Sequence, residues 1–346
     1  MTERIRVLVC DDSAFARKVL RDVLARDPGI EVVGAARDGL DALEKIASLR
    51  PDVITLDLVM PNLDGLGLLE ELAADGPRVV VVTSSAEDSE LVVRALQAGA
   101  ITAIHKPTAL ATDRLYDVAD EVIAAVRLAA AARPSGSAPP EAPRWTAAPR
   151  ADARVDLVAI GAATGGPRAI TRVLEALPGT FPAAIAIVVH MPIGYTDAFA
   201  RRLDELCPLE VLEARAGLEL RPGRAVIARA GMHLGFERVG AEVHATLGVR
   251  PLETPHRPAV DVLFQSAAHV YGDRVLGVVL TGMGNDGLAG AREIRRVGGD
   301  VIVESVSSCV VYGMPRSVAD AGLASAEGDI SAIASMISER VGPPVA

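Results

Sequence analysis

The chain has 346 residues, of which 50% are hydrophobic and 23% are charged, so we expect packed globular cores rather than disorder. Its formal net charge is −10 at pH 7 and it has no long run of Lys or Arg, which argues against nucleic acid or an anionic membrane surface as a general partner. The first residues lack the apolar stretch of a signal peptide, and no run of about 18 apolar residues indicates a membrane-inserted helix.

Chain length and cysteine usage narrow the class of protein further. A chain of this length favours two domains over one. The three cysteines, Cys10, Cys207 and Cys309, are scattered and form no CxxC pair. We expect them to be small buried hydrophobes in a protein of the reducing cytoplasm.

The N-terminal part alternates short apolar runs with helical periods. Most of the apolar runs are hydrophobic on both faces, which is typical of a parallel sheet. We predict strands over residues 5–10, 31–35, 53–56, 78–82 and 101–104. We predict helices over residues 14–26, 38–48, 86–98 and 113–132. This order predicts an α/β domain with a five-stranded parallel sheet.

A change of composition marks a boundary between two domains. The stretch RPSGSAPPEAPRWTAAPR, starting at Arg133, has five prolines among Ser, Gly and Ala, and cannot form a long helix or a core strand. We therefore predict domains at residues 1–127 and 155–342, joined by a linker at 128–154. Trp145, the one tryptophan, is expected to mark a point where the linker contacts a domain.

The C-terminal part continues the α/β pattern. The stretch VDLVAIGAATGGPRAI, from Val155 to Ile170, reads as an apolar strand, a turn of small residues and the start of a helix. We predict strands over residues 155–160, 184–189, 224–228, 275–281 and 300–303. Residues 233–249 alternate like an antiparallel hairpin with Gly240 at its turn. The second domain is therefore predicted to be a doubly wound, mostly parallel α/β fold with one antiparallel hairpin.

Polar residues follow four of the first five predicted strands. They are Asp11 and Asp12, Asp57, Thr83 and Lys106. Ligands of doubly wound sheets bind at this edge, and converging carboxylates need a cation, for which hard oxygen ligands favour Mg²⁺. With that charge compensation Asp57 could attack a phosphoryl group. The alternative for any one acidic residue is an ordinary polar strand end, but the set together favours a site.

The motifs VCDDS, TLDLVMPNLDGL, VVTSS and HKP resemble those of response-regulator receiver domains across residues 1–127. The resemblance implies a flavodoxin-like fold, Asp57 as phosphoacceptor, and Mg²⁺ bound by Asp12, Asp11 and Asp57. It further implies Thr83 as the switch hydroxyl and Lys106 as the phosphate contact. One position departs from the family, because its usual aromatic switch residue is Ala103 here.

The second domain gathers a different set at its strand ends. The small-residue turn Gly161–Gly166, His190 and Asp286 all follow predicted strands. A histidine there is often a packed core residue, and an aspartate in a Gly-rich turn is often a turn former. Together they indicate acyl transfer, with His190 as base, Asp286 as its orienter and backbone N–H groups as oxyanion donors. The set lacks a nucleophile, which should lie on the turn.

The motifs GAATGG, HMPIGYT, HRPAVDVLF, TGMGNDG and SSCVVYGMP resemble the catalytic domain of the CheB chemotaxis methylesterases. The resemblance implies hydrolysis of glutamyl methyl esters and deamidation of glutamines on chemoreceptors, without a cofactor in this domain. It implies a chemotaxis histidine kinase as phosphodonor and a monomeric protein. His190, Asp286, Thr164 and Met283 match the family, but its nucleophilic serine is replaced by Ala163.

Ala163 leaves two classes of function open. The chain is either a weakened methylesterase and glutaminase or a silent pseudo-esterase that accepts phosphate and binds receptors or the kinase. The alanine could be natural or an alteration of the chain, and Thr164 or a water activated by His190 could replace the serine. Nucleotide binding at the turn is disfavoured, because GAATGGPR has neither the lysine nor the spacing of a P-loop.

Overall fold

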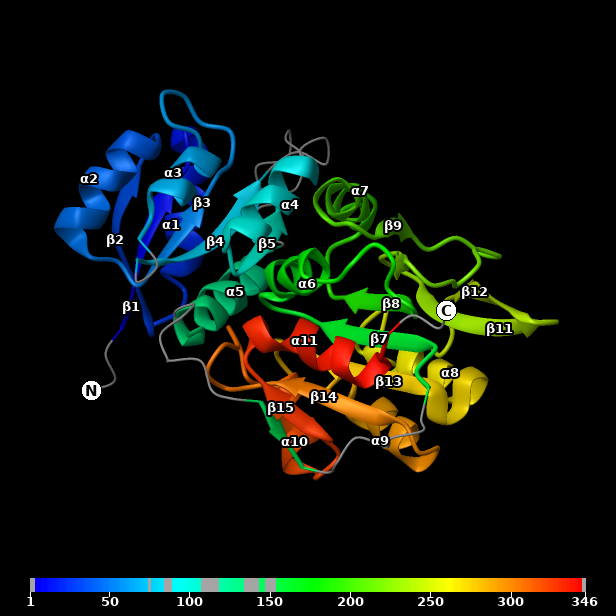
Figure 1. Cartoon of the computed structure of the whole chain (residues 1–346). Helices are drawn as coiled ribbons and strands as arrows, with labels where there is room; N and C mark the ends of the chain where they lie inside the picture. Colours follow the sequence, from blue (N-terminus) through cyan, green and yellow to red (C-terminus); the bar gives the residue numbers. More distant parts are fainter. Residues whose placement is uncertain are drawn as a thin grey trace. The chain divides into compact units, whose positions relative to one another are not determined.

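The structure is a computed structural model that describes residues 4–73, 76–83, 89–106, 118–133, 143–146 and 154–343. The chain divides into two compact units, Met1–Ser135 and Gly136–Ala346, which are described separately (Figure 1). Helix α5 (Ala119–Ala131) continues past residue 127, so the predicted start of the linker at residue 128 falls inside a helix. The alanine-rich sequence continues that helix because alanine has the highest helix propensity.

The first unit is a five-stranded parallel sheet, as predicted. Its strands are β1 (Ile5–Cys10), β2 (Ile30–Ala36), β3 (Val53–Leu56), β4 (Arg78–Thr83) and β5 (Thr102–His105). Its helices besides α5 are α1 (Ala14–Leu24), α2 (Gly39–Leu49), α3 (Gly65–Glu71) and α4 (Ser89–Ala98). The strand order is β2-β1-β3-β4-β5. The chain thus adds strands on one side of β1 first and then on the other, although all strands are parallel. This switch in strand order places a crevice at the carboxyl ends of β1 and β3.

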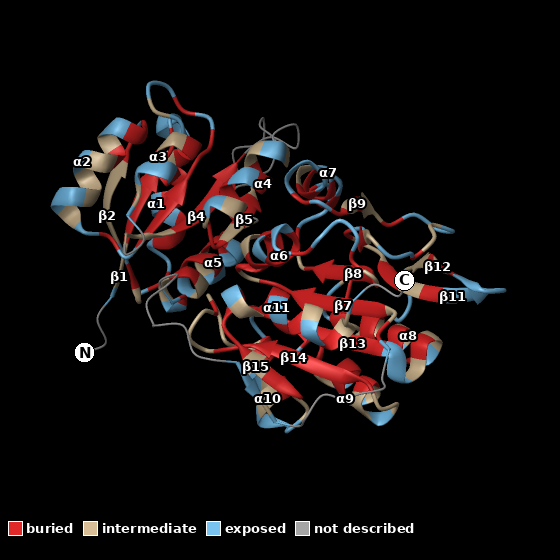
Figure 2. Cartoon of the chain, viewed as in Figure 1, coloured by how far each residue is buried: buried red, intermediate tan, exposed pale blue. Residues whose placement is uncertain are grey.

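The second unit has an eight-stranded sheet in the order β6-β15-β14-β13-β7-β8-β10-β9. Its strands are β6 (Arg144–Trp145), β7 (Leu157–Ala162), β8 (Ala184–Val189), β9 (Glu210–Glu213), β10 (Arg224–Ile227), β13 (Val275–Val279), β14 (Asp300–Glu304) and β15 (Ala326–Gly328). All neighbours pair in parallel except β6 with β15. The central strands are buried along their whole length, as Figure 2 shows for β7, β8, β13 and β14.

Helices cover both faces of this sheet (Figure 1). They are α6 (Gly166–Glu175), α7 (Thr196–Leu206), α8 (Val260–Tyr271), α9 (Leu288–Arg296), α10 (Met314–Asp320) and α11 (Ile330–Val341), with a short 3₁₀ turn at Gly272–Arg274. Phe264 of α8 and Phe199 of α7 are among the largest fully buried side chains. Burial of such side chains provides most of the favourable free energy of folding.

The predicted hairpin is confirmed as strands β11 (His233–Val239) and β12 (Glu242–Gly248), which pair antiparallel. Gly240 has φ +64° at its turn, a conformation that glycine adopts without a steric penalty. The hairpin contacts α8 through a hydrogen bond from Phe236 N to Ser266 Oγ (2.8 Å) and an edge-to-face contact between the rings of Phe236 and Tyr271.

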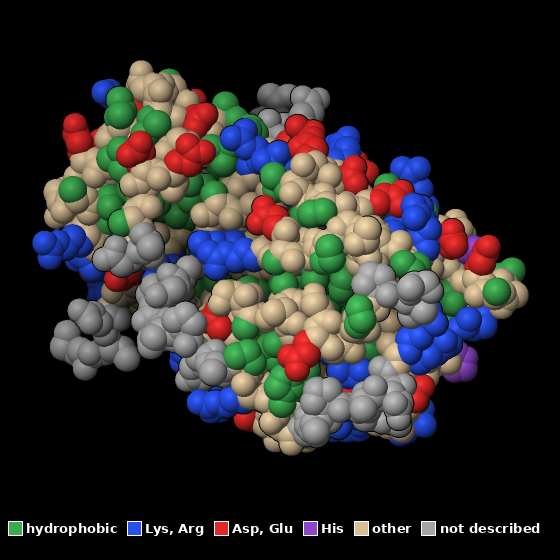
Figure 3. All heavy atoms as spheres, viewed as in Figure 1, with side chains coloured by type: hydrophobic (Ala, Val, Ile, Leu, Met, Phe, Trp, Pro, Cys, Tyr) green, Lys and Arg blue, Asp and Glu red, His purple; other side chains and the backbone are tan. Residues whose placement is uncertain are grey.

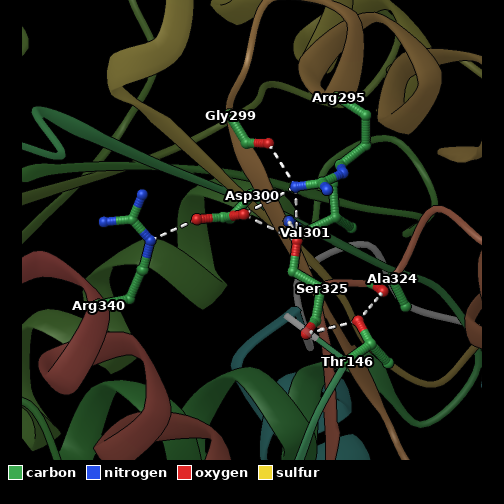
Figure 4. Close-up of polar contacts among 8 residues, drawn as sticks. All are labelled: Thr146, Arg295, Gly299, Asp300, Val301, Ala324, Ser325 and Arg340. Carbon is green, nitrogen blue, oxygen red and sulfur yellow. Dashed lines mark hydrogen bonds and ion pairs between the residues drawn. The ribbon is translucent and has the colours of Figure 1, made fainter. Parts of the chain in front are cut away.

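The end of the predicted linker is attached to the second unit. Trp145 pairs with Ala326 of β15, and Thr146 donates from its backbone N to Ser325 O at 2.9 Å. Behind this contact, Ser325 Oγ donates to the carboxylate of Asp300 (2.9 Å), which Arg295 and Arg340 also bind (Figure 4).

Burial alone would raise the pKa of Asp300, but the bonds from Arg340 and Ser325 outweigh it, so the pKa lies below the usual range. An ionised, multiply bonded carboxylate therefore fixes the edge of the sheet to which β6 adds.

The expectation about the three cysteines is confirmed. Cys10, Cys207 and Cys309 are buried free thiols. In the face drawn in Figure 3, acidic and basic side chains are interspersed within each unit, without a continuous basic stripe among the described residues. No helix in the described part of the chain is long and apolar enough to cross a membrane.

Candidate functional site

Three carboxylates meet at the sheet edge of the first unit. Asp11 and Asp12 follow β1, and Asp57 follows β3, which pairs with β1. The backbone N of Asp57 donates to Cys10 O at 2.9 Å and so fixes the two strand ends side by side. Each residue places an oxygen within 4.8 Å of the other two. This all-oxygen donor set fits a hard divalent cation such as Mg²⁺, as predicted from the sequence.

Lys106 reaches the same point from the end of β5. Its Nζ lies 2.5 Å from Oδ2 of Asp11 and 2.5 Å from Oδ2 of Asp57. Burial alone would lower the pKa of Lys106, but the two carboxylates outweigh it and raise the pKa, so the amine stays protonated. The cation compensates part of the negative charge that the three aspartates bring together.

Thr83 ends β4 beside this lysine. It is buried, and its carbonyl accepts a hydrogen bond from Lys106 N at 2.6 Å. Ala103 lies on β5 and is also buried, with the small volume of a methyl group where receiver domains usually have an aromatic ring. The structure therefore brings together all five residues that the sequence indicated at this edge, with Asp12 as the exposed one.

In the second unit, the three central strands β8, β7 and β13 bring the other predicted residues together. Ala163 follows β7, and its N donates to Thr281 O at 3.0 Å, beyond the end of β13. His190 follows β8, and its N donates to Ala162 O at 3.1 Å. Ala163, His190 and the loop that leads to Asp286 therefore occupy one edge of the sheet.

His190 and Asp286 form a hydrogen-bonded pair. His190 Nε2 lies 2.9 Å from Asp286 Oδ2, and both side chains are largely buried. Burial alone would raise the pKa of Asp286, but the bonds from His190 and from the N–H groups of Asp261 and Val260 lower it below the usual range. An ionised carboxylate only accepts, so His190 donates from Nε2. In the neutral ring, Nδ1 then has the free lone pair and is the nitrogen able to accept a proton.

The small residues of the turn are required by close packing. A Cβ at Gly161 would overlap the side chain of Val260, and one at Gly165 would lie 2.7 Å from Val310 Cγ2. Gly165 also has φ +78°, which side chains other than glycine rarely adopt. The turn leads directly into α6, and the N–H of Gly166, the first residue of that helix, donates back to Ala163 O at 2.7 Å. Its composition therefore permits both the packing and a close backbone approach to a ligand.

The remaining predicted residues lie around this turn. Ala163 is 7% exposed, and its side chain is a single methyl group. Thr164 is half-buried, and its carbonyl accepts from Thr281 Oγ1 at 2.9 Å. Met283 is 62% exposed in the loop after β13. Only Thr164, within the turn itself, has a side-chain oxygen.

Sequence reasoning missed three residues that contact the site. His256 stacks on His190, with 4.1 Å between the ring centroids and an interplanar angle of 26°. Asp261 donates from its backbone N to Asp286 Oδ1 at 2.8 Å. Glu304, buried at the end of β14, accepts from Thr281 N at 2.8 Å. The HRPAVDVLF motif contains two of them, but its spacing from His190 and Asp286 in sequence gave no sign of the contact.

Two family models match the chain. Residues 7–118 match the response regulator receiver domain family, so the chain is a response regulator in which a receiver is followed by a second α/β domain. Residues 158–337 match the CheB methylesterase family. The chain belongs to the CheB family of chemotaxis methylesterases, which are hydrolases.

Two relatives match nearly the whole chain, and a solved structure matches its second unit. A protein of Myxococcus xanthus named protein-glutamate methylesterase/protein-glutamine glutaminase 5 is 59% identical over 97% of this chain and 98% of its own. A protein of Symbiobacterium thermophilum with the same activities in its name is 44% identical over 98% and 97% of the two chains. The crystal structure of the Thermotoga maritima CheB methylesterase catalytic domain matches with a TM-score of 0.52 and 40% identity, over 53% of this chain and 97% of that one.

Proposed function

We propose that this protein is a phosphorylation-regulated chemotaxis protein whose second domain binds glutamyl methyl esters and glutamines of chemoreceptors. Its hydrolytic activity is low, because Ala163 stands where the family has its serine. The observation that supports this proposal best is the His190–Asp286 pair at 2.9 Å beside a turn that matches the family in all but the nucleophile. The remaining parts of an acyl-transfer site are then in place.

The residues of the site have separate roles in this proposal. Asp286 holds the His190 ring and stabilises its protonated form. His190 Nδ1 accepts a proton from an attacking group, and backbone N–H groups of the turn and of Met283 stabilise the developing oxyanion. Without a serine, the attacking group is water. Loss of one triad member leaves roughly 10³–10⁴-fold catalysis over water in other hydrolases, so slow turnover is expected.

The first domain is proposed to accept a phosphoryl group on Asp57 from a chemotaxis histidine kinase. Asp11, Asp12 and Asp57 would hold Mg²⁺, which supplies charge neutralisation for the transferred phosphoryl group. Lys106 contacts a phosphate oxygen, and the Thr83 hydroxyl binds the phosphorylated form. Because Ala103 replaces the aromatic residue of the switch, coupling to the second domain is expected to depend on Thr83 alone.

The second candidate is a silent pseudo-esterase that binds receptors or the kinase without turnover. The single methyl group of Ala163 favours it, since neither Thr164 nor another hydroxyl occupies that position. The two candidates differ in methanol release from methylated receptor by the unaltered chain.

We expect slow methanol release that His190→Ala abolishes and Thr164→Ala leaves within twofold. Release at the background rate in all three chains supports the pseudo-esterase. If Thr164→Ala abolishes release as His190→Ala does, threonine is the nucleophile and the proposal is contradicted.

A further inference from the structure

The HRPAVDVLF motif contains an aspartate with no role in the reaction described above. Asp261 is the second residue of α8, and its Oδ1 accepts hydrogen bonds from Gly287 N at 3.0 Å and Gly290 N at 2.7 Å. Both N–H groups belong to the start of α9, which directly follows Asp286. Asp261 therefore binds the loop that positions the orienting carboxylate.

The contact is reciprocal, because Asp286 binds the start of α8. Its Oδ2 accepts from Val260 N and its Oδ1 accepts from Asp261 N, both at 2.8 Å. Neither helix has a capping side chain of its own, since the preceding residues are Ala259 and Gly287. Each helix thus receives its N-terminal cap from a carboxylate of the other, which satisfies free N–H groups and places negative charge at the positive end of each helix.

Close packing makes this exchange possible. A Cβ at Gly290 would overlap Phe264 and would lie 3.1 Å from Asp261 Cα, so α8 and α9 approach as closely as a glycine permits. Gly287 has φ +101°, and a Cβ at this position would lie 3.1 Å from Val260 Cγ1. The loop from Asp286 to Gly290 is therefore confined by the start of α8, and its position depends on both carboxylates.

We propose that Asp261 is a positioning residue for the His190–Asp286 pair, acting through the loop that contains Asp286. This inference rests on the proposed function for its link to turnover, but the geometric part stands without it. Loss of both bonds to Gly287 and Gly290 would release the loop and lengthen the contact between Asp286 and His190. Misplacement by about 1 Å can cost roughly 100-fold in rate.

The NMR signal of the His190 Nε2 proton reports on its hydrogen bond to Asp286, and no substrate is needed to observe it. In the full unaltered chain labelled with ¹⁵N-histidine, we expect a downfield proton signal that disappears in His190→Gln, which assigns it, and in Asp286→Ala, which removes the acceptor. Asp261→Ala should lose the signal, and Asp261→Asn should keep it, because the amide oxygen can accept the same two bonds. Asp197→Ala is the matched control, since Asp197 is an exposed acid in the first turn of α7.

A signal that persists in folded Asp261→Ala would overturn the proposal, as would its loss in Asp261→Asn or in Asp197→Ala. If Asp261→Ala does not fold, Asp261→Ser, which can accept one bond, should give a weakened signal, and an unchanged signal there overturns the proposal equally. In the Ala163→Ser background, Asp261→Ala should lower kcat for methyl-ester hydrolysis roughly 10- to 100-fold with KM within twofold. An inactive Ala163→Ser chain would count against the proposed function, while the proton signal would still decide the role of Asp261.

Discussion

Glu304 is a buried carboxyl whose charge should make the stability of the second unit depend on pH. It ends β14 with its side chain fully buried, and accepts from Thr281 N at 2.8 Å and Ser308 Oγ at 2.9 Å. Burial raises its pKa from 4.5 to about 7, although these hydrogen bonds oppose the rise. Replacement by Gln removes the titration and keeps an oxygen for Thr281 N.

The direction and size of the change in stability with pH follow from the pKa values of Glu304 in the folded and unfolded states. The folded state keeps the Glu304 proton up to about pH 7, whereas the unfolded chain loses it near pH 4.5. The parent chain therefore has the full stabilising contribution of the proton below pH 4.5 and loses it as the pH rises to about 7. One pKa unit corresponds to about 1.4 kcal/mol, so the loss is about 3 kcal/mol. The Glu304→Gln variant should not show this loss of stability.

The fluorescence of Trp145, the one tryptophan, provides the assay. Trp145 pairs with Ala326 of β15, and Gly328 of the same strand pairs with Glu304 of β14. Urea unfolding followed by tryptophan fluorescence therefore reports on this edge of the sheet. The stability of Glu304→Gln relative to the parent should rise by about 3 kcal/mol between pH 4.5 and 7.5. The Glu339→Gln variant, at an exposed position of α11, is the control and should follow the parent. A difference between Glu304→Gln and the parent that stays constant with pH would refute the reasoning.

Three further predictions concern phosphorylation and the linker contact. A small phosphodonor with Mg²⁺ should label the chain at Asp57, and Asp57→Asn should abolish labelling; stoichiometric label in that variant would disprove the assignment. The phosphodonor should increase methanol release by Ala163→Ser, and an equal increase in the Asp57→Asn background would exclude regulation through this residue. Asp300→Asn removes a carboxylate that faces the buried Arg340 and should lower stability by about 3 kcal/mol in urea unfolding at pH 7; a change below 1 kcal/mol would contradict it.

Local sequence patterns predicted the parallel strands well, because buried central strands read as continuous apolar runs. Strand β8 was predicted with its observed bounds, Ala184–Val189. The edge strand β9 and the strand β15, which lies between β14 and β6, were missed. They have four and three residues and mixed polarity, so their pairing depends on neighbouring strands and not on their own pattern. The hairpin was found, because strict alternation and a glycine turn are local signals.

The candidate sites divide in the same way. The ends of parallel strands meet at one edge, so Asp11, Asp57, His190 and Asp286 could be grouped from strand order alone. Contacts made by side chains outside that edge could not be predicted from strand order. The partners of Asp286 at the start of α8 depend on how α8 and α9 pack, and sequence spacing does not reveal helix packing. The nitrogen by which His190 binds Asp286 likewise became known only from the geometry.

The most direct test of the account is methanol release from methylated receptor by the Ala163→Ser chain. The account predicts a rate increase of several orders of magnitude over the parent, up to roughly 10⁶-fold, because only the nucleophile is missing. The increase should disappear in Ala163→Ser/His190→Ala. Ala162→Ser, which places a hydroxyl on the adjacent fully buried alanine, should give no increase. A folded Ala163→Ser chain that releases methanol no faster than the parent would contradict the central claim that the rest of an acyl-transfer site is intact.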